Sequence, residues 1–96
     1  MSPTRVTLFA DPGFQGSHVV YTATGRAVQV IDKRTWLRRQ LGSLVLEAPV
    51  GSRVRLVRED GHTAILTGAG GPLFLDYDVV AGRDIDQGIG LIGWPE

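Results

Sequence analysis

Residues 5–16 read RVTLFADPGFQG, and 48 positions further along the chain residues 53–64 read RVRLVREDGHTA. Val6, Leu8 and Ala10 alternate with Thr7 and Phe9, and the second stretch alternates in the same way around Val54 and Leu56. Alternation with a period of two is typical of a β-strand that has one face in the core. Within both stretches turn residues follow the alternating part, Asp-Pro-Gly at 11–13 and Glu-Asp-Gly at 59–61, so each stretch predicts a strand that leads into a hairpin.

The correspondence between the two halves continues well beyond these stretches. Leu41-Gly42 matches Ile89-Gly90 at the same spacing, and Leu44 matches Ile92. Two halves of equal length with matching turns predict two copies of one supersecondary unit, motif 1 at about 4–48 and motif 2 at about 52–94. Neither copy could cover its own apolar face. We therefore expect them to pack face to face around one core, with residues 1–96 as a single domain.

Short β-rich runs recur between glycine and proline turns along the whole chain, and no stretch has a long helical period. The predicted strands are Arg5–Phe9, Ser17–Thr22, Ala27–Ile31, Ser43–Glu47, Arg53–Arg58, Thr63–Thr67, Leu73–Asp76 and Ile89–Ile92. Many short strands separated by such turns indicate an all-β sandwich or barrel.

The stretch from Phe9 to Gly16 fits the pattern aromatic-x-x-x-x-aromatic-x-Gly, which resembles the signature of βγ-crystallin Greek-key motifs. The resemblance implies an all-β, βγ-crystallin-like sandwich of two four-stranded Greek-key motifs with an internal pseudo-twofold. It also implies that Phe9 packs over the hairpin that carries Phe14. Gly16 should then take a backbone conformation that other residues resist.

Other parts of the chain carry the resemblance less strictly. The segment from Trp36 through Ser43 to Leu44 resembles the family's approach to the last strand of a motif, and residues 86–92 are its counterpart. The signature of the second copy is degenerate. Val57, His62 and Ala64 stand where two aromatic residues and a glycine would be.

Many members of this family bind calcium through an Asn/Asp-Asn/Asp-x-x-Ser/Thr-Ser pattern before the last strand of each motif. In the first copy Arg38 and Arg39 replace the acidic pair, and a permanent cation should exclude calcium by repulsion. The second copy retains Asp86 and Gln87 but lacks the hydroxyl pair. An alternative therefore stays open, in which these two residues and the backbone oxygens of Gly88 and Ala10, with Asp11, hold one weak Ca²⁺.

The resemblance also implies what lies opposite the two arginines. In calcium-binding relatives the ion sits between this segment of one motif and the first hairpin of the other, which here carries Glu59 and Asp60. We therefore expect the guanidinium group of Arg38 or Arg39 to lie against one of these carboxylates and to take the place of the cation.

Composition excludes several other classes. There are no cysteines, so disulfides and thiolate metal sites are excluded, and ten cations balance ten anions, which argues against a dedicated nucleic-acid binder. Residues 1–5 are not a signal peptide, which favours a cytoplasmic location, and no apolar run approaches the length of a membrane helix. The basic residues around Trp36 indicate a surface loop with a packed aromatic rather than a phosphate patch. His18 and His62 have no metal-ligand spacing, and no nucleophile motif is present.

These observations favour a non-catalytic structural or protein-binding module with degenerate calcium sites and no required cofactor. It would be a monomer or weak homodimer with, at most, an unidentified protein partner, and it would not bind membranes or nucleic acid. Two alternatives stay open besides it. One is a calcium-binding module that retains a weak site. The other is a proteinase inhibitor or a toxin- or antitoxin-like binder, although relatives of that kind usually carry disulfides.

Overall fold

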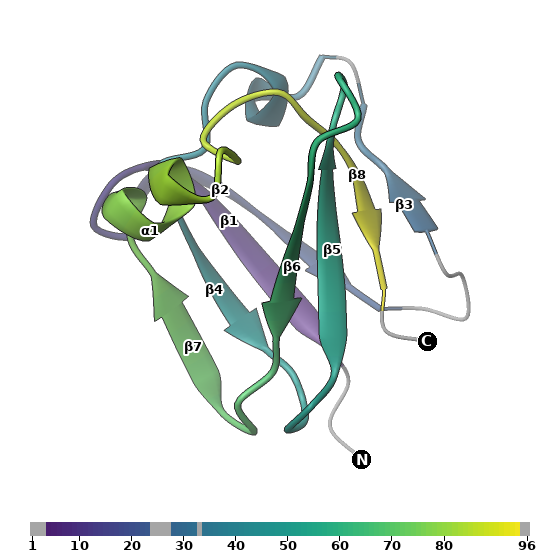
Figure 1. The fold of residues 1–96 in the computed structure, drawn as a ribbon. Coiled ribbons are helices and arrows are strands. Elements are labelled where there is room, and N and C mark those ends of the chain that lie inside the picture. The colour runs from purple at the N-terminus through teal and green to yellow at the C-terminus, as the bar shows by residue number, and fades with distance from the viewer. Residues whose placement is uncertain (1–3, 24–27, 33, 95–96) are drawn as a thin grey trace.

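The computed structural model describes residues 4–23, 28–32 and 34–94. Within them the chain forms eight strands and two short helices (Figure 1). The strands are β1 (Arg5–Asp11), β2 (Gln15–Thr22), β3 (Val28–Val30), β4 (Ser43–Glu47), β5 (Arg53–Arg58), β6 (Thr63–Thr67), β7 (Pro72–Leu75) and β8 (Ile89–Gly93). All eight predicted strands are present. Ala27, at the start of one of them, lies outside the described residues.

The strands form two four-stranded antiparallel sheets, with the orders β2-β1-β4-β7 and β3-β8-β5-β6. Each sheet takes three strands from one half of the chain and one strand from the other half. Read from its other edge, the second sheet runs β6-β5-β8-β3, which is the order of the first sheet with the two halves exchanged. The sequence repeat is therefore also a repeat of strand pairing.

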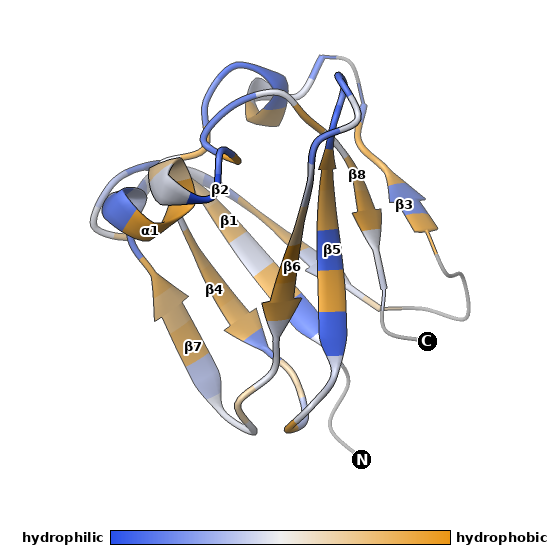
Figure 2. Cartoon of the chain, in the orientation of Figure 1, coloured by the Kyte–Doolittle hydropathy of each residue, from blue (hydrophilic) through white to orange (hydrophobic). Residues whose placement is uncertain are grey.

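The core lies between the two sheets, and the alternating strands fill it from both sides (Figure 2). Val6 and Leu8 of β1 and Val54 and Leu56 of β5 are fully buried, as the alternation predicts. Ala10 is only half-buried. The pairing of β1 with β2 shifts register between Phe9 and Asp11, and this irregularity ends the strict alternation before Ala10.

Two helical turns were not predicted from the sequence. The 3-10 helix η1 spans Trp36–Arg38, and the α-helix α1 spans Tyr77–Gly82. Both are too short to show a helical period. Asp76 begins α1 as its N-cap, since its carboxylate accepts a hydrogen bond from the backbone N–H of Tyr77, and Val80 anchors the helix in the core. Of the helices described, none is long and apolar enough to cross a membrane.

Candidate functional site

The turn between β1 and β2, here called hairpin 11–16, has the geometry that the aromatic signature implies. The rings of Phe9 and Phe14 meet edge to face with their centroids 6.0 Å apart. Gly16 has φ +81°, and a Cβ atom there would lie 2.3 Å from Oδ2 of Asp11. The bare backbone of Gly16 thus makes room for the Asp11 side chain, and the predicted special conformation of Gly16 is confirmed.

Ser43, at the start of β4, is hydrogen-bonded to the backbone of hairpin 11–16. Its side chain is fully buried. The hydroxyl donates to the backbone oxygen of Asp11 at 2.8 Å and accepts from the backbone N–H of Phe14 at 3.0 Å. One hydroxyl therefore satisfies a donor and an acceptor of a turn whose residue Phe14 has an unusual φ of +60°. In the second half the equivalent position is Leu91, which can do neither.

Two glycines at matching positions lie beneath the two hairpins. A Cβ atom on Gly42 would lie 2.2 Å from the backbone carbon of Asp11, whereas one on Gly90 would lie 3.3 Å from Cγ of Glu59. Asp11 and Glu59 are themselves equivalent in the repeat. Both halves therefore bring the beginning of the last strand, or the residue just before it, against their own hairpin, but the approach is closer in the first half.

Asp76 ties hairpin 11–16 to the second half of the chain. Its Oδ1 accepts from the backbone N–H of Gly13 at 2.9 Å and from that of Tyr77 at 2.7 Å. These two hydrogen bonds, that of Gly13 first, hold the pKa of the Asp76 carboxyl below its usual value, because they favour the charged form. One carboxylate thus caps α1 and fastens a hairpin of the other half.

This lowered pKa predicts a specific dependence of stability on pH. An acid whose pKa is lower in the folded state contributes stability above its unfolded pKa, which is about 3.9 for Asp. That contribution is lost as pH falls through the lowered folded value. We expect Asp76→Asn to flatten the decline in unfolding free energy between about pH 5 and pH 2, measured by urea unfolding at each pH. Asp78→Asn, on the same helix, is the control. Parallel pH profiles for wild type and Asp76→Asn would contradict the assignment.

Hairpin 59–62, between β5 and β6, meets the segment from η1 to β4 through Arg38. The guanidinium group of Arg38 forms an ion pair with Glu59 and donates to the backbone oxygen of Ile31 at 2.7 Å. The Arg38 side chain is 18% exposed and that of Glu59 is 52% exposed. A cation from the first half therefore lies between its own chain and an acidic hairpin of the second half, as the sequence predicts for one of its two arginines.

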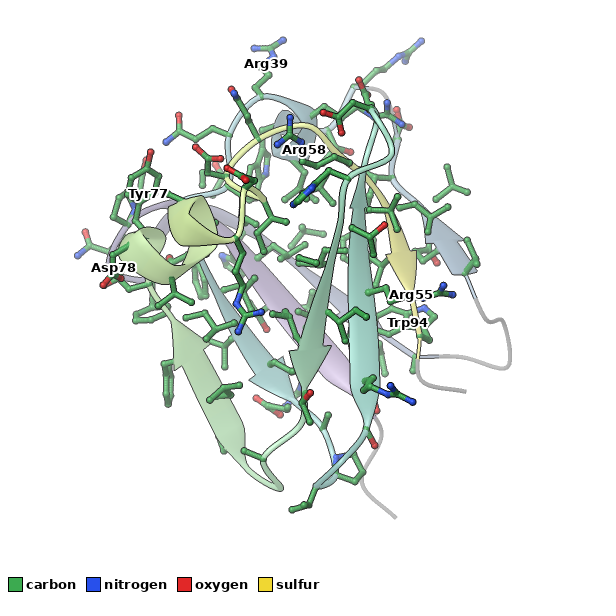
Figure 3. All side chains as sticks on the ribbon, viewed as in Figure 1. Arg39, Arg55, Arg58, Tyr77, Asp78 and Trp94 are labelled. Atoms are coloured by element: carbon green, nitrogen blue, oxygen red, sulfur yellow. The ribbon has the colours of Figure 1, made fainter. Side chains whose placement is uncertain are left out.

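The neighbouring charges take other positions. Arg39 extends away from the body of the molecule (Figure 3). Asp60 pairs with Arg58 at 2.8 Å instead of with either predicted arginine, and Arg58 also donates to the backbone oxygen of Asp84 at 2.9 Å. Asp60 lies two residues from Arg58 on the same hairpin, which makes that pair local. Trp36 is half-buried against the core, which fits the packed role expected of it.

The residues of the weak calcium alternative are engaged in hydrogen bonds of the protein. The backbone oxygen of Ala10 accepts from the side-chain amide of Gln40, and that of Asp11 accepts from Ser43. The oxygen of Gly88 accepts from the backbone N–H of Glu59, and that of Asp86 from Leu41. Gln87 is exposed. Each of these four backbone oxygens accepts one hydrogen bond from the protein, which uses one of its two lone pairs. In the described part of the chain no three His, Cys, Asp or Glu side chains gather as a metal site.

Sequence reasoning missed the contacts made by Asp76, Arg58 and His62. Asp76 could have been found as an N-cap, since it precedes Tyr77-Asp78 and an apolar pair. The ring nitrogen Nε2 of His62 lies 3.0 Å from the backbone oxygen of Arg83, and Arg58 contacts the adjacent carbonyl. Nothing in the local sequence indicates that the chain after α1 returns to this hairpin.

Comparisons with protein-family models, with curated proteins and with solved structures find no match for this chain. The resemblance to βγ-crystallins therefore rests on the residues and contacts described above.

Proposed function

We propose that this chain is a non-catalytic structural module of βγ-crystallin type, a sandwich of two Greek-key motifs, in which Arg38 replaces calcium as the cation that joins the two motifs. The observation that carries the proposal is the ion pair of Arg38 with Glu59, supplemented by the hydrogen bond to the oxygen of Ile31. A carboxylate and a backbone oxygen are ligands that suit calcium, and here they converge on a guanidinium group.

The exchange of strands between the sheets supports the Greek-key part of the proposal. β3 joins the sheet of the second half, and β7 joins the sheet of the first half. In such an arrangement each motif contributes its third strand to the partner sheet. Contacts between the motifs then determine the stability of the whole, and a built-in cation would make that stability independent of the calcium supply.

Among the alternatives, a retained calcium site has less support, because in the part of the chain that the structure describes no three His, Cys, Asp or Glu side chains gather as a metal site. Binding to a proteinase, toxin or other protein partner stays a prediction from the resemblance.

Thermal unfolding in calcium and in chelator tests the proposal. We expect the wild type to melt at the same temperature in both. A ligand at 100 times its Kd would add about 2.7 kcal/mol, and each kcal/mol raises Tm by about 4–8 °C in a domain of this size. Arg38→Gln should lower Tm by a few degrees in both solutions, because an ion pair exposed to this extent contributes only about 1 kcal/mol. Arg39→Gln is the matched control and should change neither value.

A double variant tests the exchange itself. Arg38→Asn with Arg39→Asp restores the acidic pair of the family pattern, and we expect it to lose stability in chelator and to regain part of it in millimolar calcium. A wild-type Tm that rises by more than about 10 °C in calcium, reversibly with chelator, would show a working site and overturn the proposal. A double variant that neither loses stability nor responds to calcium would also contradict it.

A further inference from the structure

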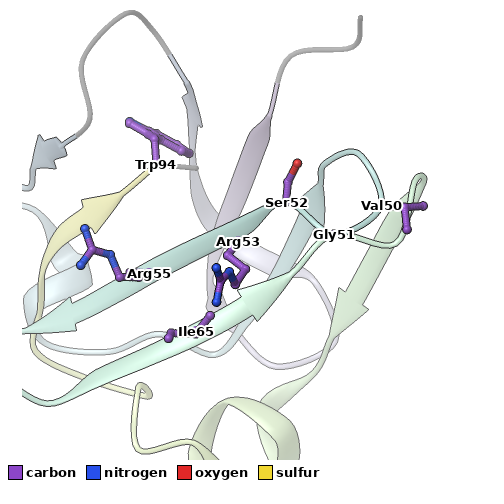
Figure 4. Close-up of a pocket in the computed structure, with 7 residues that line it drawn as sticks. All are labelled: Val50, Gly51, Ser52, Arg53, Arg55, Ile65 and Trp94. Carbon is purple, nitrogen blue, oxygen red and sulfur yellow. The ribbon is translucent and has the colours of Figure 1, made fainter. Parts of the chain in front are cut away.

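A hollow of about 490 Å³ lies on the outer face of the second sheet (Figure 4), and neither hairpin 11–16 nor Arg38 or Glu59 lines it. Its walls come from the loop before β5, from β5 and β6, and from the residue after β8. The residues that line it are Val50, Gly51, Ser52, Arg53, Arg55, Ile65 and Trp94. Since Val54 and Leu56 point into the core, Arg53 and Arg55 between and beside them point outward into this hollow.

A glycine on the neighbouring strand leaves room for the Arg55 side chain. Gly93 of β8 pairs with Arg55, and a Cβ atom on Gly93 would lie 2.9 Å from Nε and 3.2 Å from Nη2 of that arginine. The guanidinium group therefore lies across bare backbone, in a space that any other residue at 93 would fill. On the opposite side Arg55 pairs with Ile65 of β6, so an apolar side chain borders the same group.

The rim of the hollow is fixed by backbone hydrogen bonds. The N–H of Gly51 donates to the oxygen of Gly68 at 3.2 Å, that of Ser52 to Pro49 at 3.1 Å, and that of Gly68 to Ser52 at 2.7 Å. These bonds hold Ser52 and Arg53 at the edge of a defined loop. Within the part of the chain that the structure describes, the Ser52 hydroxyl and the Arg53 guanidinium group bind no other residue, so both can serve a ligand.

The chemistry of the walls selects the ligand. Two of the seven lining residues are arginines and none is acidic. Val50 is 80% exposed and Ile65 is 47% exposed, so apolar surface beside the two arginines is open to a ligand. Trp94 is only 3% exposed, which leaves its ring no free face on which a planar base could stack.

We propose that this hollow binds a carboxylate attached to a compact aliphatic group. Arg53 and the Ser52 hydroxyl would bind the carboxylate, because a guanidinium group donates two parallel hydrogen bonds to it. Arg55 forms the wall beside Ile65, and Val50 and Ile65 cover the aliphatic part. The carboxylate can belong to a free branched acid or to the C-terminus of a peptide ending in leucine. This site goes beyond the structural role proposed above and does not depend on it.

An NMR titration of the ¹⁵N-labelled chain tests the site. The probes are 4-methylpentanoate and acetyl-glycyl-leucine with a free carboxylate, each paired with its uncharged amide, and inorganic phosphate. We expect saturable shifts at the amides of residues 50–55 and 65 and at the indole of Trp94 with the two acids only. The tighter of the two acids identifies the source of the carboxylate.

Three variants sharpen the assignment. Arg53→Gln should weaken binding about fivefold. The effect stays below tenfold, which corresponds to about 1.4 kcal/mol, because the Arg53 guanidinium group is exposed to water. Gly93→Ala should displace Arg55 from the wall of the hollow and weaken binding by a similar factor. Arg55→Ala, which removes that wall, gives the same test if Gly93→Ala does not fold. Arg34→Gln, an exposed arginine elsewhere, should change nothing.

Several results would overturn the proposal. Equal binding of acids and amides would remove the carboxylate from it, and phosphate bound as tightly as the acids would leave only an unspecific anion site. Shifts confined to other surfaces, no shifts at 20-fold molar excess and above, or unchanged affinity in Arg53→Gln would reject the site.

Discussion

Gly42→Ala should unfold this protein at temperatures where the wild type is intact, lowering the free energy of unfolding by about 3 kcal/mol or more. The added Cβ atom would lie 2.2 Å from the backbone carbon, 2.6 Å from Cα and 2.6 Å from the oxygen of Asp11. All three are backbone atoms, so no rotation of a side chain can relieve the overlap. Relief requires moving hairpin 11–16, which Ser43 and Asp76 hold in place.

The repeat supplies the matched control. Gly90→Ala places its Cβ atom 3.3 Å from Cγ of Glu59, which can move a few tenths of an ångström. We expect Gly90→Ala to destabilise by less than about 1 kcal/mol, and Gly42→Ala to lower Tm by about 15 °C, from the 4–8 °C per kcal/mol of a domain this size. Thermal melts of both variants check this. Equal shifts in the two would show that the close approach in the first half has no special role.

Ser43→Ala should destabilise by about 2 kcal/mol, because it leaves two partly buried backbone groups without partners. The N–H of Phe14 loses its acceptor, and the backbone oxygen of Asp11 loses its donor. Ser17→Ala, an exposed position on β2, is the control and should change stability by less than about 0.5 kcal/mol.

Hydrogen exchange separates this mechanism from a general loss of packing. We expect the amide of Phe14 to exchange faster in Ser43→Ala, by more than the change in global stability explains, while core amides of β5 and β8 follow global stability. If the Phe14 amide keeps its protection relative to the core, the hydroxyl does not hold the hairpin.

The strand pattern could be predicted from the sequence because burial imposes it locally. β4, β5 and β6 begin and end at the predicted residues, since their apolar residues alternate between clear turns. β1 continues past Phe9 to Asp11, because the chain crosses an irregularity and still pairs with Gln15. α1 was missed since six residues give no period, and its N-cap acts together with a hairpin that is distant in sequence.

The candidate site was predictable to the extent that it follows the resemblance to βγ-crystallins. The resemblance implies an arginine of the first half against the acidic hairpin of the second half, and Arg38 contacts Glu59. The sequence does not show whether Arg38 or Arg39 makes this contact, because the answer depends on the direction in which η1 orients each side chain. Nor could it assign Asp60, which pairs with Arg58 beside it.

The exchange of β3 and β7 between the sheets has a consequence for how such a chain could arise. Because the two sheets have the same order with the halves exchanged, two copies of a single half could form the same pairings as a homodimer, each lending its third strand to its twin. Joining the copies through residues 48–52 turns that encounter into an intramolecular one, at an effective concentration on the order of millimolar. Assembly then no longer depends on how much of the chain a cell makes. Once joined, the halves are free to differ: one keeps a serine beneath its hairpin, and the other receives an arginine from its twin.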